Sequence, residues 1–306
     1  MTNHSGIPVN EIIRFLGDSV KTIHGNTEGL IIKHLKAPKK VDADTLDWIN
    51  SQKHEKQKIA SDSAARVIIS DSEVRYDEQL AGQNKVLIIV DNPRLAIAKI
   101  GNAFFVKKPE PGIHPSAVIH REALIGKDAY VGPNVTIGKC KIGDNATIHD
   151  GVSISENVEL GNNVVIKPGA VLGYEGFGFE RMEDGLLIKF PQLGKLIIHD
   201  NVEIGSNTCI DRGALSDTII KSGVKINNLC HIAHNVVIDK NAIITGHVNI
   251  SGSTTIEEDV WIAPNASLRG HQRIGKGATI GMGAVVTKDV PAGETWVGNP
   301  AKKLGK

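Results

Sequence analysis

The 306-residue sequence contains little cysteine, and its charges nearly cancel. Its three cysteines, Cys140, Cys209 and Cys230, are odd in number and widely spaced, so they fit neither a disulfide framework nor a zinc knuckle. A reducing, cytoplasmic location is therefore expected. The 35 basic and 34 acidic residues give a net charge of +1. Because no basic stripe with interleaved aromatic residues appears, nucleic acid is not an expected partner.

Long hydrophobic runs and aromatic residues are also scarce. No segment approaches the roughly 20 apolar residues that a membrane span needs, and the N-terminal segment "MTNHSGIPVNEIIRF" lacks the features of a signal peptide. Hydrophobic residues still make up 41% of the chain and charged residues 23%, which favours a packed protein over a disordered one. With 4% aromatic residues and 32 glycines, the composition suggests a turn-rich β architecture.

A proline-rich segment, "PEPGIHP" at residues 109–115, divides the sequence. Before it, "NEIIRFLG" has helical spacing and ends at Gly17, "ARVIIS" and "KVLIIV" are typical of strands, and "NPRLAIAKIGNAFF" predicts a helix. This alternation predicts a small α/β domain over residues 1–108.

After the junction the sequence repeats in sixes, as in "VKINNL", "CHIAHN", "VVIDKN" and "AIITGH". The third residue is aliphatic, the first is small or β-branched, and the last three favour turns. This pattern predicts a mainly β fold, a parallel β-helix over residues 113–290 whose coils each contain three short strands. Residues 291–306 are expected to form a short closing segment. Flat faces on identical prisms favour a homotrimer with ligand-sized clefts between subunits.

Two segments interrupt the repeat, and insertions in such folds often carry function. The first runs from Gly173 to Lys195, "GYEGFGFERMEDGLLIKFPQLGK", and either forms part of a binding site or packs on a neighbouring subunit. The second, "DRGALSDT", is expected to shorten a coil and to displace Asp211 and Arg212 from the regular face.

Histidines stand at several turns of the repeat. Ile232 points inward in "CHIAHN", so His231 faces outward and His234 lies at the turn. His271 follows His234 by 37 residues, close to two coils, which predicts the same edge about 10 Å further along the axis. His247 falls on a different edge. An imidazole in a cleft suits proton abstraction, whereas the HxxH spacing on a strand and turn does not favour a metal site.

The stretch from Gly173 to Ile238, with "GYEGFGFE", "IDRGALSDT" and "IAHN", closely resembles the UDP-3-O-(3-hydroxyacyl)glucosamine N-acyltransferases of lipid A and lipopolysaccharide biosynthesis. The resemblance extends from about Lys85 to Gly283. It implies a trimer of left-handed β-helices and an α/β domain that binds the uridine of a nucleotide sugar. It also implies an acyl thioester as co-substrate, with no permanently bound cofactor and no metal.

The resemblance assigns roles to individual residues. His234 corresponds to the general base that deprotonates the sugar 2-amino group, and His271 corresponds to a residue that binds substrate or stabilises the oxyanion. The substrate-binding residues that it implies are Trp48, Asn50, Glu175, Phe177, Phe179, Lys189, Gln192, Asn228 and Asn235.

The sequence departs from that family at several places. Glu175 replaces an Asp, His231 replaces a Gln, and the uridine-binding segment is altered around Trp48 and Asn50. The segment "GAVVTKDVPAGETWVGNPAKKL" instead resembles coenzyme A-dependent acetyltransferases. The acyl donor is therefore either acyl carrier protein or coenzyme A, and short-chain acylation of another nucleotide amino sugar for surface polysaccharide is an alternative. A non-catalytic, sugar-nucleotide-binding scaffold is a second alternative.

Overall fold

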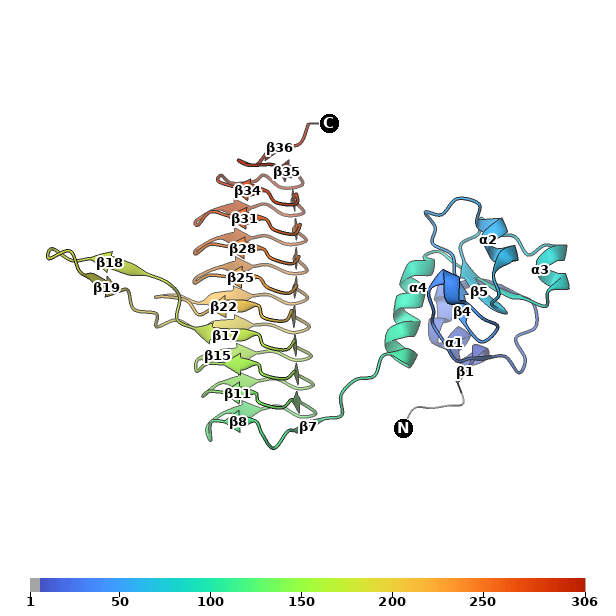
Figure 1. The fold of residues 1–306 in the computed structure, drawn as a ribbon, viewed down its shortest axis with the longest axis horizontal. Coiled ribbons are helices and arrows are strands. Elements are labelled where there is room, and N and C mark those ends of the chain that lie inside the picture. The colour runs from blue at the N-terminus through green and yellow to red at the C-terminus, as the bar shows by residue number, and fades with distance from the viewer. Residues whose placement is uncertain (1–5, 306) are drawn as a thin grey trace. The chain divides into compact units, whose positions relative to one another are not determined.

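The computed structural model describes residues 6–305, and the chain divides after Lys108 into two compact units. Figure 1 shows a small unit of strands and helices and a long prism of stacked coils. Each unit has its own hydrophobic core. Within the described residues, no helix has the length and apolarity to cross a membrane.

The first unit is a four-stranded sheet with helices on both faces. The strand order is β2–β6–β5–β4, in which only β2 runs antiparallel to its neighbour. Strands β5 and β6 are apolar except for Ser70, because both of their sides are buried. Helices α1 and α4 cover one side of the sheet, and α2 and α3 cover the other. The elements are β1 (Ile7–Pro8), α1 (Val9–Leu16), β2 (Val20–His24), β3 (Ile31–Ile32), β4 (Leu46–Trp48), α2 (Lys56–Asp62), β5 (Val67–Ser70), α3 (Glu78–Gly82), β6 (Val86–Val90) and α4 (Pro93–Ile100).

The second unit is a parallel β-helix whose three sheets form the faces of a prism (Figure 1). Face 1 contains β7 (Gly112–Ile113), β10 (Tyr130–Val131), β13 (Thr147–Ile148), β16 (Val165–Ile166), β21 (Glu203–Ile204), β24 (Lys225–Ile226), β27 (Ile243–Ile244), β30 (Trp261–Ile262), β33 (Thr279–Ile280), β35 (Thr295–Val297) and β36 (Lys302–Lys303).

The other two faces follow face 1 in every coil. Face 2 contains β8 (Val118–Ile119), β11 (Thr136–Ile137), β14 (Ser153–Ile154), β17 (Val171–Tyr174), β22 (Cys209–Asp211), β25 (His231–Ile232), β28 (Asn249–Ile250), β31 (Ser267–Leu268) and β34 (Val285–Val286). Face 3 contains β9 (Leu124–Ile125), β12 (Lys141–Ile142), β15 (Val158–Leu160), β20 (Leu196–Ile198), β23 (Thr218–Ile220), β26 (Val237–Ile238), β29 (Thr255–Ile256) and β32 (Arg273–Ile274).

The hexapeptide pattern explains this prism directly. The third residue of each unit is buried inside, as Ile226, Ile232 and Ile238 show for one coil. After most strands the chain bends through a residue in the left-handed region, and Asn235 does so with a φ of 61°. Asparagine adopts this conformation more readily than most residues, so its frequency at the turns has a steric cause.

Both interruptions of the repeat leave the prism at the edge between faces 2 and 3. The first forms a hairpin, β18 (Phe179–Arg181) and β19 (Leu187–Lys189), which projects away from the prism in Figure 1. The second was expected to shorten a coil, and that expectation is wrong. Cys209 pairs with His231, whereas His231 pairs with Asn249, so the "DRGALSDT" coil is four residues longer than the next.

The prism ends in a strand and a turn. β35 extends face 1, and β36 turns back to pair with it antiparallel. Trp296 packs against the last layer of the core.

Candidate active site

The edge between faces 2 and 3 carries both histidines that the sequence analysis assigns to chemistry. His234 follows β25, and His271 follows β31, with β28 lying between these two strands on face 2. Two steps of about 4.8 Å separate them along the axis. His247 lies between β27 and β28, on the edge between faces 1 and 2. The predicted arrangement of the three histidines is therefore present.

A cleft of about 860 Å³ lies along this edge, between the hairpin and the prism. The hairpin, the "DRGALSDT" loop and the turns of the next coils line it together. It brings together six residues assigned to the site from the sequence, namely Phe177, Phe179, Gln192, His234, Asn235 and His271. The cleft forms within one chain, so it does not require a second subunit to exist.

His234 is half-buried and is held between two glycines. A Cβ atom at Gly252 would lie 2.8 Å from Cε1 and 2.9 Å from Nε2 of the ring. A Cβ atom at Gly176 would lie 2.9 Å from the His234 Cβ and 3.0 Å from Cδ2. Carbon atoms do not approach this closely, so the imidazole fits only because both positions lack side chains.

The hydrogen bonds of Asn235 determine which nitrogen of His234 carries the proton. The Asn235 amide group donates to the Ser216 carbonyl at 2.9 Å, and its Oδ1 accepts the Ala214 backbone N–H at 3.1 Å. Because Oδ1 is thereby identified as the acceptor, His234 Nδ1, 2.9 Å away, must donate to it. In the neutral ring Nε2 then bears the free lone pair, as a general base requires.

Gln192 supplies an unused acceptor next to this imidazole. Its side chain is buried and lines the cleft, and its Nε2 donates to the Phe190 carbonyl at 3.2 Å. Its Oε1 has no hydrogen-bond partner among the described residues. Both Oε1 and the His234 ring lie close to Gly176: a Cβ atom added there would be 3.0 Å from Oε1 and 3.0 Å from His234 Cδ2. A buried acceptor of this kind favours a ligand N–H or O–H.

Glu175 and Lys189 pair with each other at the base of the hairpin. The hydrogen bond from Lys189 holds the pKa of the Glu175 carboxyl below its usual value. Arg212, whose side chain is mostly buried, lies 3.3 Å from Glu175 and 3.6 Å from Glu156. Glu175, Lys189 and Arg212 therefore form an ionic cluster, and this cluster stabilises the base of the hairpin.

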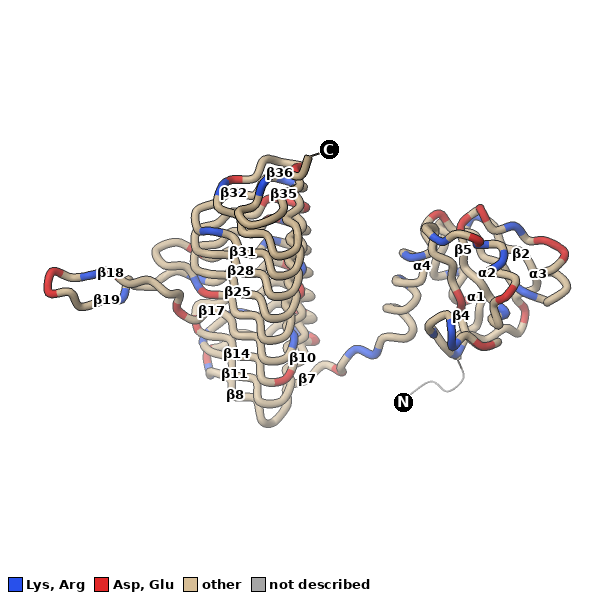
Figure 2. The backbone as a smooth tube through the Cα atoms, turned by 45° about the horizontal axis from the view of Figure 1, so that its top comes forward, with Lys and Arg blue, Asp and Glu red and all other residues tan. Residues whose placement is uncertain are grey.

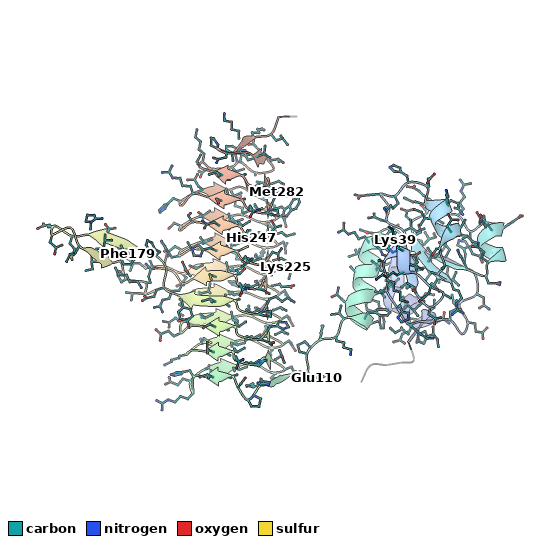
Figure 3. All side chains as sticks on the ribbon, viewed as in Figure 1. Lys39, Glu110, Phe179, Lys225, His247 and Met282 are labelled. Atoms are coloured by element: carbon teal, nitrogen blue, oxygen red, sulfur yellow. The ribbon has the colours of Figure 1, made fainter. Side chains whose placement is uncertain are left out.

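The hairpin presents a mostly apolar surface. Phe177 is 86% exposed, and its ring meets that of Phe179 edge-on, with centroids 5.0 Å apart. Leu186, Leu187 and Ile188 are also exposed. Charged residues gather at the tip, where Figure 2 shows the acidic turn between β18 and β19, and Figure 3 shows Phe179 on the hairpin itself. Apolar surface of this extent is typical of a binding or association site.

Three of the assigned residues lie elsewhere. Asn228 stands at the edge between faces 1 and 2, where its Oδ1 accepts the Ser206 N–H at 2.7 Å, so it stabilises a turn and is not brought together with His234. Trp48 and Asn50 belong to the first unit. Trp48 packs against its core, and Asn50 Oδ1 accepts the Gln52 N–H at 3.1 Å.

Sequence reasoning did not assign Ser253, Gly252 or Asp211 to the site. Ser253 lines the cleft on the coil between His234 and His271. Asp211 is largely buried, and burial raises the pKa of its carboxyl while His231 and His234 oppose that rise. Residues 6–305 contain no group of three His, Cys, Asp or Glu side chains placed to hold a metal ion.

The repeat and the three-sided prism define a class of protein. The model of the family described as "Bacterial transferase hexapeptide (six repeats)" matches residues 139–174 and 253–288. The chain therefore contains hexapeptide repeats and folds into a left-handed parallel β-helix, and the predicted fold class is confirmed.

Sequence similarity to curated proteins points to a narrower group than the fold class does. This chain is 47% identical over 140 residues to the UDP-3-O-acylglucosamine N-acyltransferase of Methylorubrum populi. The matched region covers 46% of this chain and 40% of that protein. The chain is 52% identical over 139 residues to the same-named protein of Caulobacter vibrioides, in a match that covers 45% and 41%. The chain thus spans about two fifths of the length of these curated relatives. They confirm the resemblance predicted from the sequence.

Solved structures of related proteins have the same fold. A UDP-N-acetylglucosamine acyltransferase from Bacteroides fragilis matches with a TM-score of 0.58 and 28% identity, over 63% of this chain and 74% of that chain. The Arabidopsis UDP-N-acetylglucosamine acyltransferase matches with a TM-score of 0.53 and 29% identity, over 63% and 74%.

Proposed function

We propose that this chain is an N-acyltransferase that moves an acyl group from a thioester to the amino group of a nucleotide-linked amino sugar. The acceptor that we propose is UDP-3-O-acylglucosamine, the compound in the names of the relatives. The proposal rests on one observation, the environment of the His234 imidazole. Its Nδ1 is hydrogen-bonded to Asn235, its Nε2 is free, and the ring lines a cleft with an apolar wall.

His234 acts as the general base in this proposal. Nε2 accepts a proton from the attacking amino nitrogen while that nitrogen bonds to the thioester carbonyl carbon. The C–S bond then breaks, and the imidazolium returns the proton to the departing thiolate sulfur. The hydrogen bond from His234 Nδ1 to Asn235 Oδ1 supports both proton transfers. It holds the imidazole in one orientation and stabilises the imidazolium.

His271 and Gln192 bind the reactants. His271 lines the same cleft two coils from His234, where an imidazole N–H can stabilise the oxyanion or bind the donor. The exposed Phe177 and Phe179 rings suit the hydrocarbon of an acyl chain, and the free Oε1 of Gln192 suits an N–H or O–H of the sugar.

A panel of donors and acceptors tests this function. Purified full-length chain is mixed with UDP-3-O-acylglucosamine, or with another nucleotide amino sugar, and with acyl carrier protein or coenzyme A thioesters of different chain length. The measurement is the release of free thiol. The resemblance of residues 283–304 to coenzyme A-dependent enzymes makes short-chain acyl-coenzyme A a second candidate donor. Inertness with every amino sugar nucleotide would reject both candidates.

We also propose that the chain works as a homotrimer in the cytoplasm. The exposed apolar residues of the hairpin and the flat faces of the prism support association of identical chains around a threefold axis. The three cysteines are free, which supports a reducing location.

A further inference from the structure

Gln192 lies in the wall of the cleft with its side-chain amide held in one orientation. The residue is 2% exposed and lines the cleft together with His234. Its Nε2 donates to the Phe190 carbonyl at 3.2 Å. The reverse orientation would bring Oε1 against that carbonyl, so that two acceptors would face each other. Nε2 is therefore the end of the amide next to Phe190, and Oε1 is the end left for another partner.

Two glycines at the base of the hairpin show where each end of this amide lies. A Cβ atom at Gly178 would lie 3.4 Å from Gln192 Nε2, and one at Gly176 would lie 3.0 Å from Oε1. The same Cβ position at Gly176 is 3.0 Å from Cδ2 of His234, the ring carbon bonded to Nε2. Oε1 and that carbon are thus separated by at most twice this distance. Two acceptors, Gln192 Oε1 and His234 Nε2, therefore lie close together at the cleft.

The Oε1 atom of Gln192 lacks the partner that a buried acceptor normally has. In the described part of the chain, no donor forms a hydrogen bond with it. A buried acceptor without a hydrogen bond lowers stability, and native structures retain few of them. Because Gln192 lines the cleft, the cleft is the side from which a bound molecule reaches Oε1. An N–H or O–H of that molecule would complete the hydrogen bond.

We propose that Gln192 selects an amine over a hydroxyl as the group that is acylated. This inference rests on the proposed function. A primary amine has two N–H bonds. One proton passes to His234 Nε2 as the nitrogen bonds to the thioester carbonyl carbon, and the second N–H donates to Gln192 Oε1. The C–S bond then breaks, and the imidazolium returns its proton to the thiolate. A hydroxyl has a single O–H, which the base takes, so nothing is left to donate to Oε1.

The hydrogen bond to Oε1 is strongest while the new bond forms. The attacking nitrogen becomes positively charged as it bonds to carbon, and a charged donor makes a stronger hydrogen bond than a neutral one. An interaction that strengthens in the transition state raises kcat and not only affinity. The amide product keeps one N–H for Oε1, whereas an ester product has none. Sites that hydrogen-bond a substrate N–H or O–H discriminate strongly against analogues that lack it.

The test compares two acceptors that differ in one group, UDP-3-O-acylglucosamine and the same compound with a hydroxyl in place of the 2-amino group. The full-length parent chain and Gln192→Met are assayed with both by thiol release. Methionine has a similar length but offers no oxygen acceptor. We expect kcat/KM for the amine to fall by about 10-fold to 100-fold while that for the hydroxyl changes by less than about twofold. A loss of packing alone would lower both equally.

Gln272→Met is the matched control. The Nε2 of Gln272 donates to the Gly270 carbonyl at 3.2 Å, and its buried Oε1 has no partner among the described residues, but Gln272 does not line the cleft. Its substitution should leave the ratio of the two acceptors at the parental value. The inference is overturned if Gln192→Met keeps the parental ratio, or if Gln272→Met narrows the ratio by the same factor.

Product binding gives a second measurement that does not depend on turnover. Calorimetry compares the 2-amide product with its 2-ester counterpart, and the parent chain should bind the amide about 10-fold more tightly. Gln192→Met should bind both equally, with its thermal unfolding midpoint showing that it is folded. An inactive parent chain that prefers the amide through Gln192 rejects only the proposed function. An active parent chain that binds amide and ester alike rejects only this inference.

Discussion

At the residue scale, neighbours rather than residue type distinguish the histidines of the prism. His247 and His271 both occupy the last position of a hexapeptide, with φ of 59° and 62°, where an asparagine or glycine is the usual choice. His234 stands one position earlier, and Asn235 takes the left-handed conformation instead. This shift by one residue lets Asn235 hold the His234 ring through a hydrogen bond.

We predict that Gly252→Ala removes most activity without unfolding the chain. The new Cβ would lie 2.8 Å from His234 Cε1, so the imidazole must move. Misplacement of a catalytic group by about 1 Å costs on the order of 100-fold in turnover. The measurement is kcat from thiol release, together with the thermal unfolding midpoint.

Gly246→Ala is the matched control for that substitution. Gly246 has the same place in its hexapeptide, but the nearest atom to an added Cβ is 3.6 Å away, on another edge. Its turnover should equal that of the parent chain. Full activity in Gly252→Ala would mean that the position of the imidazole does not matter.

The period of six predicted that His234 and His271 share one edge, because it places every residue on a face or an edge. It could not find Asp211 or Gly252. Asp211 reaches His231 only through the register between a lengthened coil and a regular one, and the length of an irregular loop does not reveal that register. Gly252 resembles every other turn glycine until the side chain beside it is known.

At the element scale, repeating structure was predictable and irregular structure was not. The β-helix follows from a local pattern repeated in every coil, so each unit supports the same assignment. The hairpin was recognised as an interruption, but whether it would project and form a wall of the cleft depended on contacts outside the repeat. Asn228 lies one turn before His234, on the edge between faces 1 and 2.

In the first unit, Lys85 holds the end of α2. Its buried Nζ donates to the carbonyls of Ala60, Ser61 and Ser63 at 2.8, 2.9 and 2.6 Å, and burial lowers its pKa. We predict that Lys85→Met lowers the free energy of unfolding by about 2–4 kcal/mol, because the carbonyls lose a charged donor.

Chemical denaturation monitored by circular dichroism measures that loss. Lys58→Met, on the exposed side of the same helix, is the control and should change stability by less than about 0.5 kcal/mol. Equal stability of the two variants would show that the buried ammonium group does not support α2.

At the scale of the whole molecule, the apolar hairpin predicts association. Light scattering after gel filtration should give three chain masses for the parent protein. Replacing Leu187 and Ile188, which are 57% and 53% exposed on β19, by serine should weaken the trimer if the hairpin contributes to its contacts.

Leu95→Ser is the control for that experiment, since Leu95 is similarly exposed but belongs to the first unit. It should leave the mass unchanged. A monomeric parent chain at micromolar concentration would contradict the proposed trimer, although the cleft, formed within one chain, would remain.

The central claim is that the His234 imidazole removes a proton from the acceptor amine. Its most direct test compares turnover and acceptor binding for the parent chain and His234→Ala. Loss of a general base is expected to reduce kcat by about 100-fold to 10,000-fold while the nucleotide sugar still binds. If His234→Ala turns over at the parental rate, or if the parent chain binds the sugar nucleotide without acylating it, the account is wrong and the prism is a binding scaffold.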